Sequence, residues 1–348
     1  MGAQDPATAP ADLPSEANLR DRLQRRLSEV EGRPVAVGAL RQFPAGFSWI
    51  TLGASVTRGE QRCEIILRLG PPNGLFAPYS AAPQYLSLEA LAGSDVPVPR
   101  VLDWSDDPAI LGAPFFVSEK VEGVTPVPWG SGTDVDPVWR ESIATDFVGA
   151  LAALHRFEWR PTAIARWSSG LTRENAAIGQ VDDWEAKAKS WALRPFPMLQ
   201  RAFSWLRARP PVAPKIAVVH GDYRLGNFLE IDGRITAILD WELVHLGDPV
   251  EDLGWAMLPQ YRGGTGLVCQ LAPEETFLRR YEAAAGFAVD PAALRFYRVF
   301  SLVKLASTHI AAARCYEDGR FNDLRMPAMA TQIAPVLRQI EKVLEAGP

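Results

Sequence analysis

The first well-patterned segment of the chain carries apolar residues at helical spacing, with charged residues between them. These apolar residues are Leu19, Leu23, Leu27 and Val30. Ser15 stands where a helix cap is expected, because its hydroxyl can accept a hydrogen bond from the first turn. Gly32 and Pro34 follow the last apolar residue and are typical of a helix end. The segment therefore predicts an amphipathic helix that buries one stripe.

Short β-rich pieces follow this helix. They are residues 35–43, 47–56 and 63–69, with a turn at Thr57-Arg58-Gly59 between the last two. Pieces of this length separated by turns predict an antiparallel sheet built from hairpins. Residues 78–92 have the pattern of a helix that ends at Gly93, and two further extended pieces follow at 99–104 and 115–121.

The pattern changes at about Glu122, where a passage rich in proline and glycine begins. Beyond it, most of the chain has helical spacing. The clearest helical segments are residues 136–155, 273–285, 291–316 and 326–346. The sequence thus predicts an α+β protein, in which one extended crossing joins a small antiparallel-sheet lobe to a larger, mostly helical lobe.

The composition is that of a folded globular protein of about two domains, with 348 residues, 47% hydrophobic content and a net charge of −5. No basic stripe with interleaved aromatic residues occurs, so nucleic acid is not expected as a partner. No run of 18 apolar residues occurs, so no membrane span is expected. The widely spaced Cys63, Cys269 and Cys315 predict free thiols, and residues 1–14 predict a disordered leader. We therefore expect a cytoplasmic protein.

Two polar segments interrupt apolar runs in the second half of the chain. The first is HGDYRLGN, residues 220–227, and the second is LDWELVHLGDPVEDLGW, residues 239–255. Between them, FLEI turns at Asp232-Gly233 into RITAIL, which predicts a hairpin. Such a hairpin would bring Asn227 close to Asp240.

The residue types in these two segments are those that phosphoryl transfer requires. The side-chain oxygens of Asn227 and Asp240 are hard ligands that suit Mg²⁺ bound to the phosphates of a nucleotide. Asp222, on the same loop as Asn227, is placed to accept a proton from an attacking hydroxyl. Each residue alone also fits an ordinary turn or strand end, but their joint spacing favours chemistry. A metallohydrolase site built on His220 and Asp222 is disfavoured because further ligands are missing.

The HGD-x4-N pattern followed by LDWE resembles the aminoglycoside phosphotransferase family of kinase-like enzymes. The segments HGDYRLGNFL and AILDWELVHLGDPVEDLGW are especially similar to the branch that includes the kinase-like domain of certain acyl-CoA dehydrogenases. The resemblance implies a bilobal protein-kinase-like fold with Mg²⁺ as cofactor and ATP or GTP as phosphate donor. It implies a nucleotide-binding lobe at residues 15–121, a linker near 117–123, and a catalytic and substrate lobe at 122–348.

By the same resemblance, Asp222 is the catalytic base, Asn227 is the metal ligand of the catalytic loop, and Asp240 is the principal Mg²⁺ ligand. Arg224 is expected to counter the charge of a phosphate or of the substrate.

Three further polar residues are expected to shape the structure. His220 is expected to hydrogen-bond to the backbone or to Asp240. Asp248 and Asp252 are expected to cap and brace the helix that follows them.

The phosphate-covering turn of the nucleotide site is expected in the small lobe. The resemblance puts Gly46, Ser48 and Thr51 in this turn, where a glycine permits close approach of the backbone and hydroxyls can bind phosphate. Trp49 stands where the family often has asparagine.

The resemblance also puts Arg68 in place of the strand lysine that holds the α- and β-phosphates in protein kinases. A guanidinium can bind two phosphate oxygens at once, so this replacement is chemically sound. Its helix partner would be Gln84, which can orient Arg68 by a hydrogen bond, with Glu89 as the alternative. The adenine is expected to lie against the backbone of Glu119, Lys120 and Val121.

These features predict a Mg²⁺-dependent kinase that transfers the γ-phosphate of a nucleotide to a hydroxyl of a small molecule. Residues 160–215 contain more basic than acidic residues and many apolar ones, which disfavours a polycationic aminoglycoside and favours a partly apolar acceptor. One alternative is a pseudokinase that binds nucleotide without turnover, which Gln84 and Trp49 favour. A protein kinase is disfavoured, because the segment from Asp240 to Asp252 is too short for an activation loop.

Overall fold

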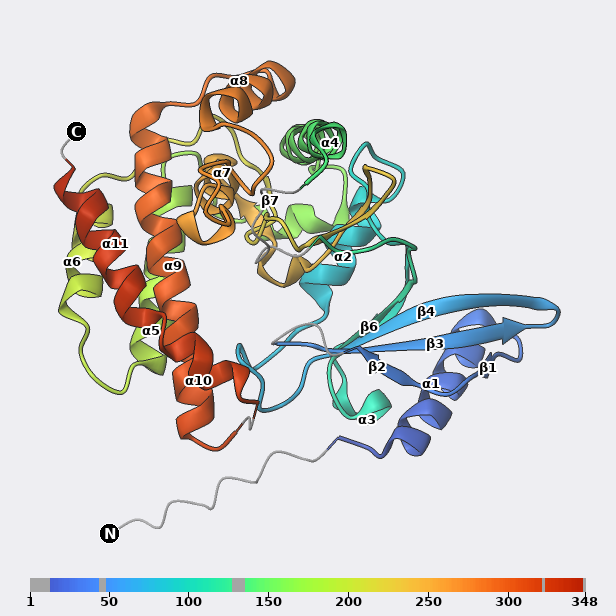
Figure 1. The fold of residues 1–348 in the computed structure, drawn as a ribbon. Coiled ribbons are helices and arrows are strands. Elements are labelled where there is room, and N and C mark those ends of the chain that lie inside the picture. The colour runs from blue at the N-terminus through green and yellow to red at the C-terminus, as the bar shows by residue number, and fades with distance from the viewer. Residues whose placement is uncertain (1–12, 44–47, 127–134, 321–322, 347–348) are drawn as a thin grey trace, which may run out of the picture. The chain divides into compact units, whose positions relative to one another are not determined.

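The computed structural model describes residues 13–43, 48–126, 135–320 and 323–346 (Figure 1). By their contacts, these residues form two compact units. The first lies within Met1–Tyr85, Arg100–Lys120 and Glu317–Asn322, and the second within Leu86–Pro99, Val121–Tyr316 and Asp323–Pro348. Gly46 and most of the expected leader, residues 1–14, lie outside the described residues. The lobe limits at residues 15–121 and 122–348 stay a prediction.

Helix α1, Glu16–Glu31, is the amphipathic helix that the sequence predicts. The Ser15 hydroxyl accepts a hydrogen bond from the Asn18 N–H at 3.5 Å, and Gly32 ends the helix with a left-handed φ of 64°. The three leucines of the predicted stripe are buried. Val30, the fourth predicted member, is 48% exposed, because the buried stripe ends one turn before the helix does.

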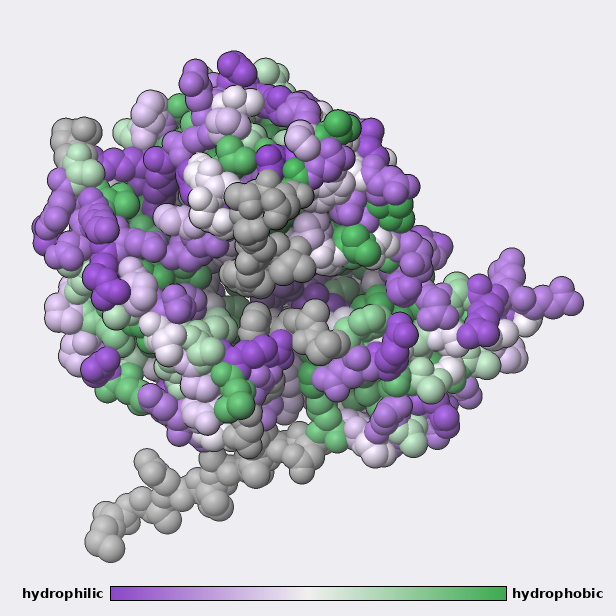
Figure 2. Space-filling view, in the orientation of Figure 1, coloured by the Kyte–Doolittle hydropathy of each residue, from purple (hydrophilic) through white to green (hydrophobic). Residues whose placement is uncertain are grey.

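The sheet of the first unit is antiparallel throughout, in the order β1-β3-β4-β6-β5 with β2 beside β3. Its strands are β1 (Ala36–Val37), β2 (Arg41–Phe43), β3 (Ile50–Arg58), β4 (Gln61–Leu69), β5 (Val101–Ser105) and β6 (Phe115–Glu119). The β3–β4 turn comes later than predicted, because Arg58 still pairs with Gln61 and leaves a two-residue turn that begins at Gly59, φ 63°. The tip of this hairpin, at the right of Figure 2, is hydrophilic.

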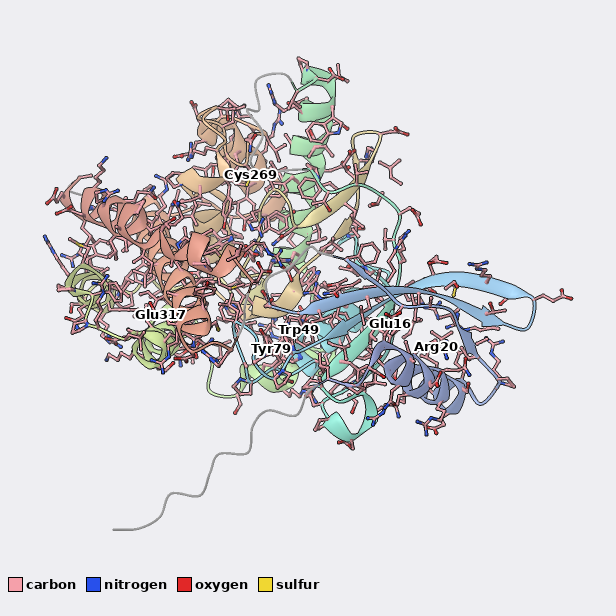
Figure 3. The ribbon with its side chains drawn as sticks, turned by 60° about the horizontal axis from the view of Figure 1, so that its bottom comes forward. Glu16, Arg20, Trp49, Tyr79, Cys269 and Glu317 are labelled. Atoms are coloured by element: carbon pink, nitrogen blue, oxygen red, sulfur yellow. The ribbon has the colours of Figure 1, made fainter. Side chains whose placement is uncertain are left out.

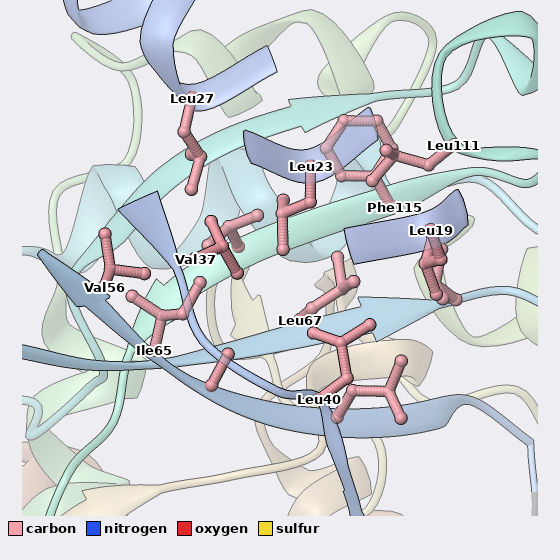
Figure 4. Packing of buried hydrophobic residues seen from close by; sticks show 14 of the residues in the cluster. Leu19, Leu23, Leu27, Val37, Leu40, Val56, Ile65, Leu67, Leu111 and Phe115 are labelled. Carbon is pink, nitrogen blue, oxygen red and sulfur yellow. The ribbon is translucent and has the colours of Figure 1, made fainter. Parts of the chain in front are cut away.

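The core of the first unit lies between α1 and one face of this sheet (Figure 4). Leu23 of α1 packs in the same cluster as Val56, Ile65 and Phe115 of the strands. The short helix α3, Pro108–Leu111, was not predicted from the sequence and adds Leu111 to the cluster. Burial of each such side chain is worth roughly 1.5–3 kcal/mol, so this cluster holds α1 on the sheet.

Helix α2, Ala82–Leu91, begins four residues later than the sequence predicts. The reason is Asp106, whose carboxylate accepts hydrogen bonds from the Ser80 hydroxyl at 2.7 Å and from the Ala81 N–H at 2.6 Å. A carboxylate that binds the residues just before a helix acts as its cap from a distance and fixes where the helix begins.

The second unit is mostly helical. Its helices are α4 (Pro137–Arg156), α5 (Ala176–Trp191), α6 (Pro197–Arg207), α7 (Val250–Ala256), α8 (Glu274–Ala285), α9 (Pro291–Glu317), α10 (Arg325–Ala330) and α11 (Ile333–Glu345), with 3-10 helices η1 (Ala163–Ser168), η2 (Trp241–Leu243) and η3 (Pro259–Tyr261). The single helix predicted at 326–346 is divided into α10 and α11. Pro335 explains the break, because it has no N–H to continue the helical hydrogen bonding from α10.

Helix α9 is buried on most of its surface, so the stretch from Phe296 to Ile310 belongs to the core. Among the described residues, no helix has both the length and the apolar character needed to cross a bilayer. Among the described residues, Cys63, Cys269 and Cys315 form no disulfide.

His309 of α9 makes the stability of the protein dependent on pH. Its side chain is 8% exposed, and burial lowers its pKa from the usual value to about 4. The unfolded chain binds a proton at this residue near pH 6.5, whereas the folded chain does not, so stability is lost as the pH falls from 6.5 toward 4. At pH 5 we expect a loss of about 2 kcal/mol in the free energy of unfolding relative to neutral pH.

Urea unfolding of wild type and His309→Leu at pH 7.5 and pH 5 checks this expectation. The leucine variant should lose less stability between the two pH values than wild type does. Equal losses in the two proteins would show that the pKa of His309 does not differ between the folded and the unfolded chain.

Candidate active site

The two polar segments meet around a hairpin in the second unit. Strands β8 (Phe228–Ile231) and β9 (Arg234–Ile238) pair antiparallel, and the two-residue turn between them has φ values of 49° at Asp232 and 76° at Gly233. The hairpin is thus formed as predicted. Just beyond it, the Leu239 N–H donates to the Asn227 carbonyl at 2.8 Å, so Asp240 directly follows the residue paired with Asn227.

The loop that carries Asp222 leaves β7 (Ala217–Val219), which pairs with β10 (His245–Gly247). Gly221 has a φ of +82°, and a Cβ atom at this position would lie 2.5 Å from the Leu243 carbonyl oxygen. Only glycine fits there. The His220 ring nitrogen Nε2 lies 2.9 Å from the Leu239 carbonyl, which is one of the two contacts expected for His220. Burial lowers the pKa of the His220 imidazole.

Asp252 differs from its predicted role. It lies inside α7, is 0% exposed, and accepts hydrogen bonds from the N–H groups of His220 and Gly221, each at 2.8 Å. His155 Nε2 lies 3.1 Å from the same carboxylate. Asp252 therefore braces the loop of residues 220–227 rather than its own helix. Asp248 does cap α7, because its carboxylate accepts a hydrogen bond from the Val250 N–H at 2.9 Å.

Asp222 is 8% exposed, and its carboxylate is held by three donors. Asn227 Nδ2 donates to Oδ2 at 2.6 Å, whereas Arg224 Nε and Trp255 Nε1 both donate to Oδ1, at 3.0 and 2.6 Å. The sequence suggested neither Trp255 nor the direct pairing of Arg224 with Asp222. A carboxylate held by this many donors keeps a fixed orientation.

Arg224 is partly buried beneath Tyr261, with the guanidinium carbon 5.4 Å from the centre of the ring. Burial opposes its charge, but the charges of Asp222, Tyr261 and Asp240 act the other way and raise its pKa. The guanidinium therefore remains charged beside the carboxylate.

Asn227 and Asp240 supply oxygens that fit a divalent cation. The Asn227 amide nitrogen is committed to Asp222, donating to its backbone carbonyl at 2.9 Å and to Oδ2, so the amide oxygen is the atom that can bind a cation. Asp240 has a left-handed φ of 65°, a conformation that is uncommon outside glycine and is often found at functional sites. One carboxylate and one amide oxygen are what Mg²⁺ needs when phosphates and water complete its shell.

In the first unit, β3 and β4 bring two predicted nucleotide residues together. Thr51 lies directly opposite Arg68 in the register, so both side chains leave the same face of the sheet. Ser48 is buried just before β3. The N–H groups of Glu119 and Lys120 donate to the carbonyls of Arg100 and Glu64, at 2.8 and 3.0 Å.

Gln84 does not make the predicted hydrogen bond to Arg68. Its side chain is 2% exposed, and neither its amide oxygen nor its amide nitrogen has a hydrogen-bond partner in the part of the chain that the structure describes. The Gln84 amide therefore does not orient Arg68 by a hydrogen bond.

Trp49, which stands in place of the family's asparagine, packs inward. Its ring centre lies 5.1 Å from that of Tyr79 (Figure 3) and 6.1 Å from that of Phe116, the residue opposite Arg68 on β6. Trp49 is 4% exposed, so its ring adds buried apolar surface beside the Thr51–Arg68 pair.

The antiparallel sheet of the first unit and the loop architecture of the second define a kinase-like fold. A candidate aminoglycoside phosphotransferase from Ralstonia eutropha has a crystal structure that matches with a TM-score of 0.74 and 24% identity, over 94% of this chain and 99% of that one. A thermostable mutant of aminoglycoside phosphotransferase APH(4)-Ia, in complex with ADP and hygromycin B, matches with a TM-score of 0.61 and 18% identity, over 94% and 99%. The predicted fold class is confirmed.

The chain belongs to the phosphotransferase enzyme family, whose model matches residues 39–297. "Acyl-CoA dehydrogenase family member 10" of Mus musculus is 29% identical over 201 residues, which are 57% of this chain and 18% of that protein. "Acyl-CoA dehydrogenase family member 11" of Rattus norvegicus is 30% identical over 222 residues, 63% of this chain and 28% of that protein. The chain thus matches less than a third of the length of these relatives, and the resemblance to their branch is confirmed.

Proposed function

We propose that the protein is a Mg²⁺-dependent O-phosphotransferase that acts on a hydroxyl of a small molecule. The observation that carries this proposal is the set of three hydrogen-bond donors that hold the Asp222 carboxylate, one of which is the amide of Asn227. In this role Asp222 orients the acceptor hydroxyl and takes its proton as the oxygen attacks the γ-phosphorus. Arg224 keeps the carboxylate in place and adds positive charge near the transferring group.

Asn227 and Asp240 are the residues that would hold the metal. A bound Mg²⁺ supplies positive charge that neutralises the nucleotide phosphates and keeps them in line with the acceptor. The side chains of Asn227 and Asp240 suit Mg²⁺ because both offer hard oxygen ligands and both lie at the open end of the β8–β9 hairpin.

The nucleotide, ATP or GTP, is assigned to residues of the first unit. Arg68 steadies the α- and β-phosphates, with Thr51 beside it and Gly46 and Ser48 in the covering turn. Gln84, whose buried amide lacks a partner among the described residues, is not assigned to the nucleotide. Two of the three linker N–H groups are already used by neighbouring strands, so an N–H contact to the base falls to Val121.

The acceptor is proposed to be a partly apolar, hydroxylated molecule rather than an aminoglycoside. The related APH(4)-Ia mutant is in complex with ADP and hygromycin B. Here the helical stretch 160–215 is richer in basic than in acidic residues, which opposes a polycation. The second candidate function is a nucleotide-binding pseudokinase, which is favoured by the Gln84 amide, buried without a partner in the part of the chain that the structure describes.

A thermal-shift titration with ATP and GTP, with and without Mg²⁺, tests the proposal on wild type, Asp240→Ala and the surface control Asp183→Ala. Nucleotide at about 100 times its dissociation constant should stabilise wild type by roughly 2.7 kcal/mol, a rise of a few degrees in the melting temperature. Asp240→Ala should lose the Mg²⁺-dependent part of this rise, because one of its two side-chain ligands is gone. Asp183→Ala should keep it, since Asp183 pairs with Lys187 on the exposed face of α5.

The outcomes separate the two candidates. Binding with turnover supports the kinase, and binding without turnover on a panel of hydroxylated acceptors supports the pseudokinase. No stabilisation by either nucleotide would contradict both.

A further inference from the structure

One of the donors that hold the Asp222 carboxylate comes from outside its loop. Arg224 and Asn227 lie two and five positions from Asp222, and both would follow the loop if it moved. Trp255 lies 33 positions away in the last turn of α7, and its Nε1 is 2.6 Å from Oδ1. Among these donors, Trp255 is therefore the one that ties the carboxylate to the helical scaffold.

The acceptor of the Trp255 N–H distinguishes this indole, which can donate a hydrogen bond but cannot accept one. Two other tryptophans donate to backbone carbonyls, Trp159 to Ile216 and Trp241 to Ile238, each at 3.0 Å. Those bonds satisfy a polar atom in the core. The Trp255 bond is shorter and ends on a carboxylate, as expected for a charge-assisted hydrogen bond.

The Trp255 ring is itself fixed by a buried ammonium. Lys304 of α9 is 1% exposed, and its Nζ lies 5.1 Å from the centre of the Trp255 ring and 5.4 Å from that of Trp184. The same Nζ donates to the Gly221 carbonyl at 2.7 Å and to Glu251 Oε1 at 3.0 Å. The Lys304 ammonium thus contacts both Gly221, the residue before Asp222, and the Trp255 ring, which donates to Asp222. This one side chain therefore holds the indole and the loop in place together.

We propose that Trp255 is a positioning residue for the base: its indole N–H fixes Asp222 Oδ1, so that the one remaining acceptor direction of the carboxylate, on Oδ2, faces the acceptor hydroxyl. A carboxylate offers about four acceptor directions, and three are used by Trp255, Arg224 and Asn227. Without the indole N–H, the carboxylate can turn toward Arg224 and misplace the base. This inference rests on the proposed function, because the role of Asp222 comes from it.

The contact is tested first without reference to activity, by NMR of the ¹⁵N-labelled indole groups of the full chain. The Trp255 signal is assigned by its absence in Trp255→Phe. In Asp222→Ala it should move upfield by more than any other of the 11 tryptophan signals, because its charged acceptor is lost. In Asp232→Asn, a change in the β8–β9 turn, it should not move. A Trp255 indole signal whose chemical shift does not change in Asp222→Ala would overturn the proposal.

Turnover is then measured as MgATP hydrolysis with water as acceptor. Trp255→Phe should lower kcat by about 10- to 100-fold and leave the KM for MgATP within about twofold, because only the placement of the base has changed. Replacement of Trp255 by 3-benzothienylalanine, which keeps the shape of the ring but lacks the N–H, should give the same loss. Trp159→Phe, which removes an indole bonded to a backbone carbonyl, should keep the wild-type kcat.

Full activity with benzothienylalanine would show that only the bulk of the ring matters and would overturn the proposal. A wild type that neither binds nor hydrolyses MgATP contradicts the proposed function instead, and the indole signal then decides the positioning contact alone.

Discussion

Asp222→Asn is expected to lower phosphoryl transfer by about 10²- to 10⁴-fold, the range that a general base contributes. The amide cannot take a proton from the acceptor. Trp255, Arg224 and Asn227 all donate to the present carboxylate. The NH₂ group of asparagine is itself a donor, so it would face another donor in place of one of these hydrogen bonds. Nucleotide binding should persist, since the phosphates are assigned to other residues. Initial rates of MgATP turnover and a thermal-shift titration measure the two effects separately.

Asp232→Asn is the matched control for this variant. It makes the same chemical change ten positions along, in the exposed turn of the β8–β9 hairpin, where asparagine tolerates the positive φ of 49° as well as aspartate does. It should keep wild-type turnover and stability. If Asp222→Asn turned over as fast as this control, Asp222 would not be the base.

The parts of this site that the sequence predicted are those fixed by local rules. The hairpin between Asn227 and Asp240 follows from an Asp-Gly turn between two apolar runs, and its turn dihedrals are those of the expected type. The opposition of Thr51 and Arg68 likewise follows from two strands joined by a short turn. In each case the residues that decide the geometry lie within about 20 positions of one another.

The parts that the sequence did not predict depend on contacts between distant segments. Asp252 binds the loop 31 and 32 positions earlier, and Lys304 reaches Gly221 across 83 positions. No spacing rule connects such residues, because their meeting depends on how the helices pack. A signal was present for Lys304 all the same: a single lysine inside the apolar run FSLVKLAS of a helix buried on most of its surface needs a partner.

Gln84 was assigned wrongly to a hydrogen bond with Arg68 for a related reason. Spacing gives the turn of a helix on which a residue lies, but not which neighbours cover it. In α2 the Gln84 amide is buried and has no hydrogen-bond partner among the described residues.

Asp252→Asn is expected to destabilise the protein by about 3 kcal/mol, although it changes one atom of a buried side chain. The carboxylate now accepts from the N–H groups of His220 and Gly221 through its two different oxygens, and His155 Nε2 lies 3.1 Å from one of them. An amide has only one oxygen. Its NH₂ must face a backbone N–H, which leaves a buried donor without an acceptor. Urea unfolding followed by tryptophan fluorescence measures the loss.

The same variant should also lower turnover, because the loop that carries Asp222 loses a contact at one of the two preceding residues, His220 or Gly221. Asp136→Asn is the control: Asp136 caps α4 by accepting the Val138 N–H at 3.0 Å in an exposed position, and asparagine caps a helix equally well. That variant should unfold at the wild-type urea concentration. An Asp252→Asn protein as stable and as active as Asp136→Asn would mean that the backbone of His220 and Gly221 holds its conformation without Asp252, through the Lys304 and Leu239 contacts alone.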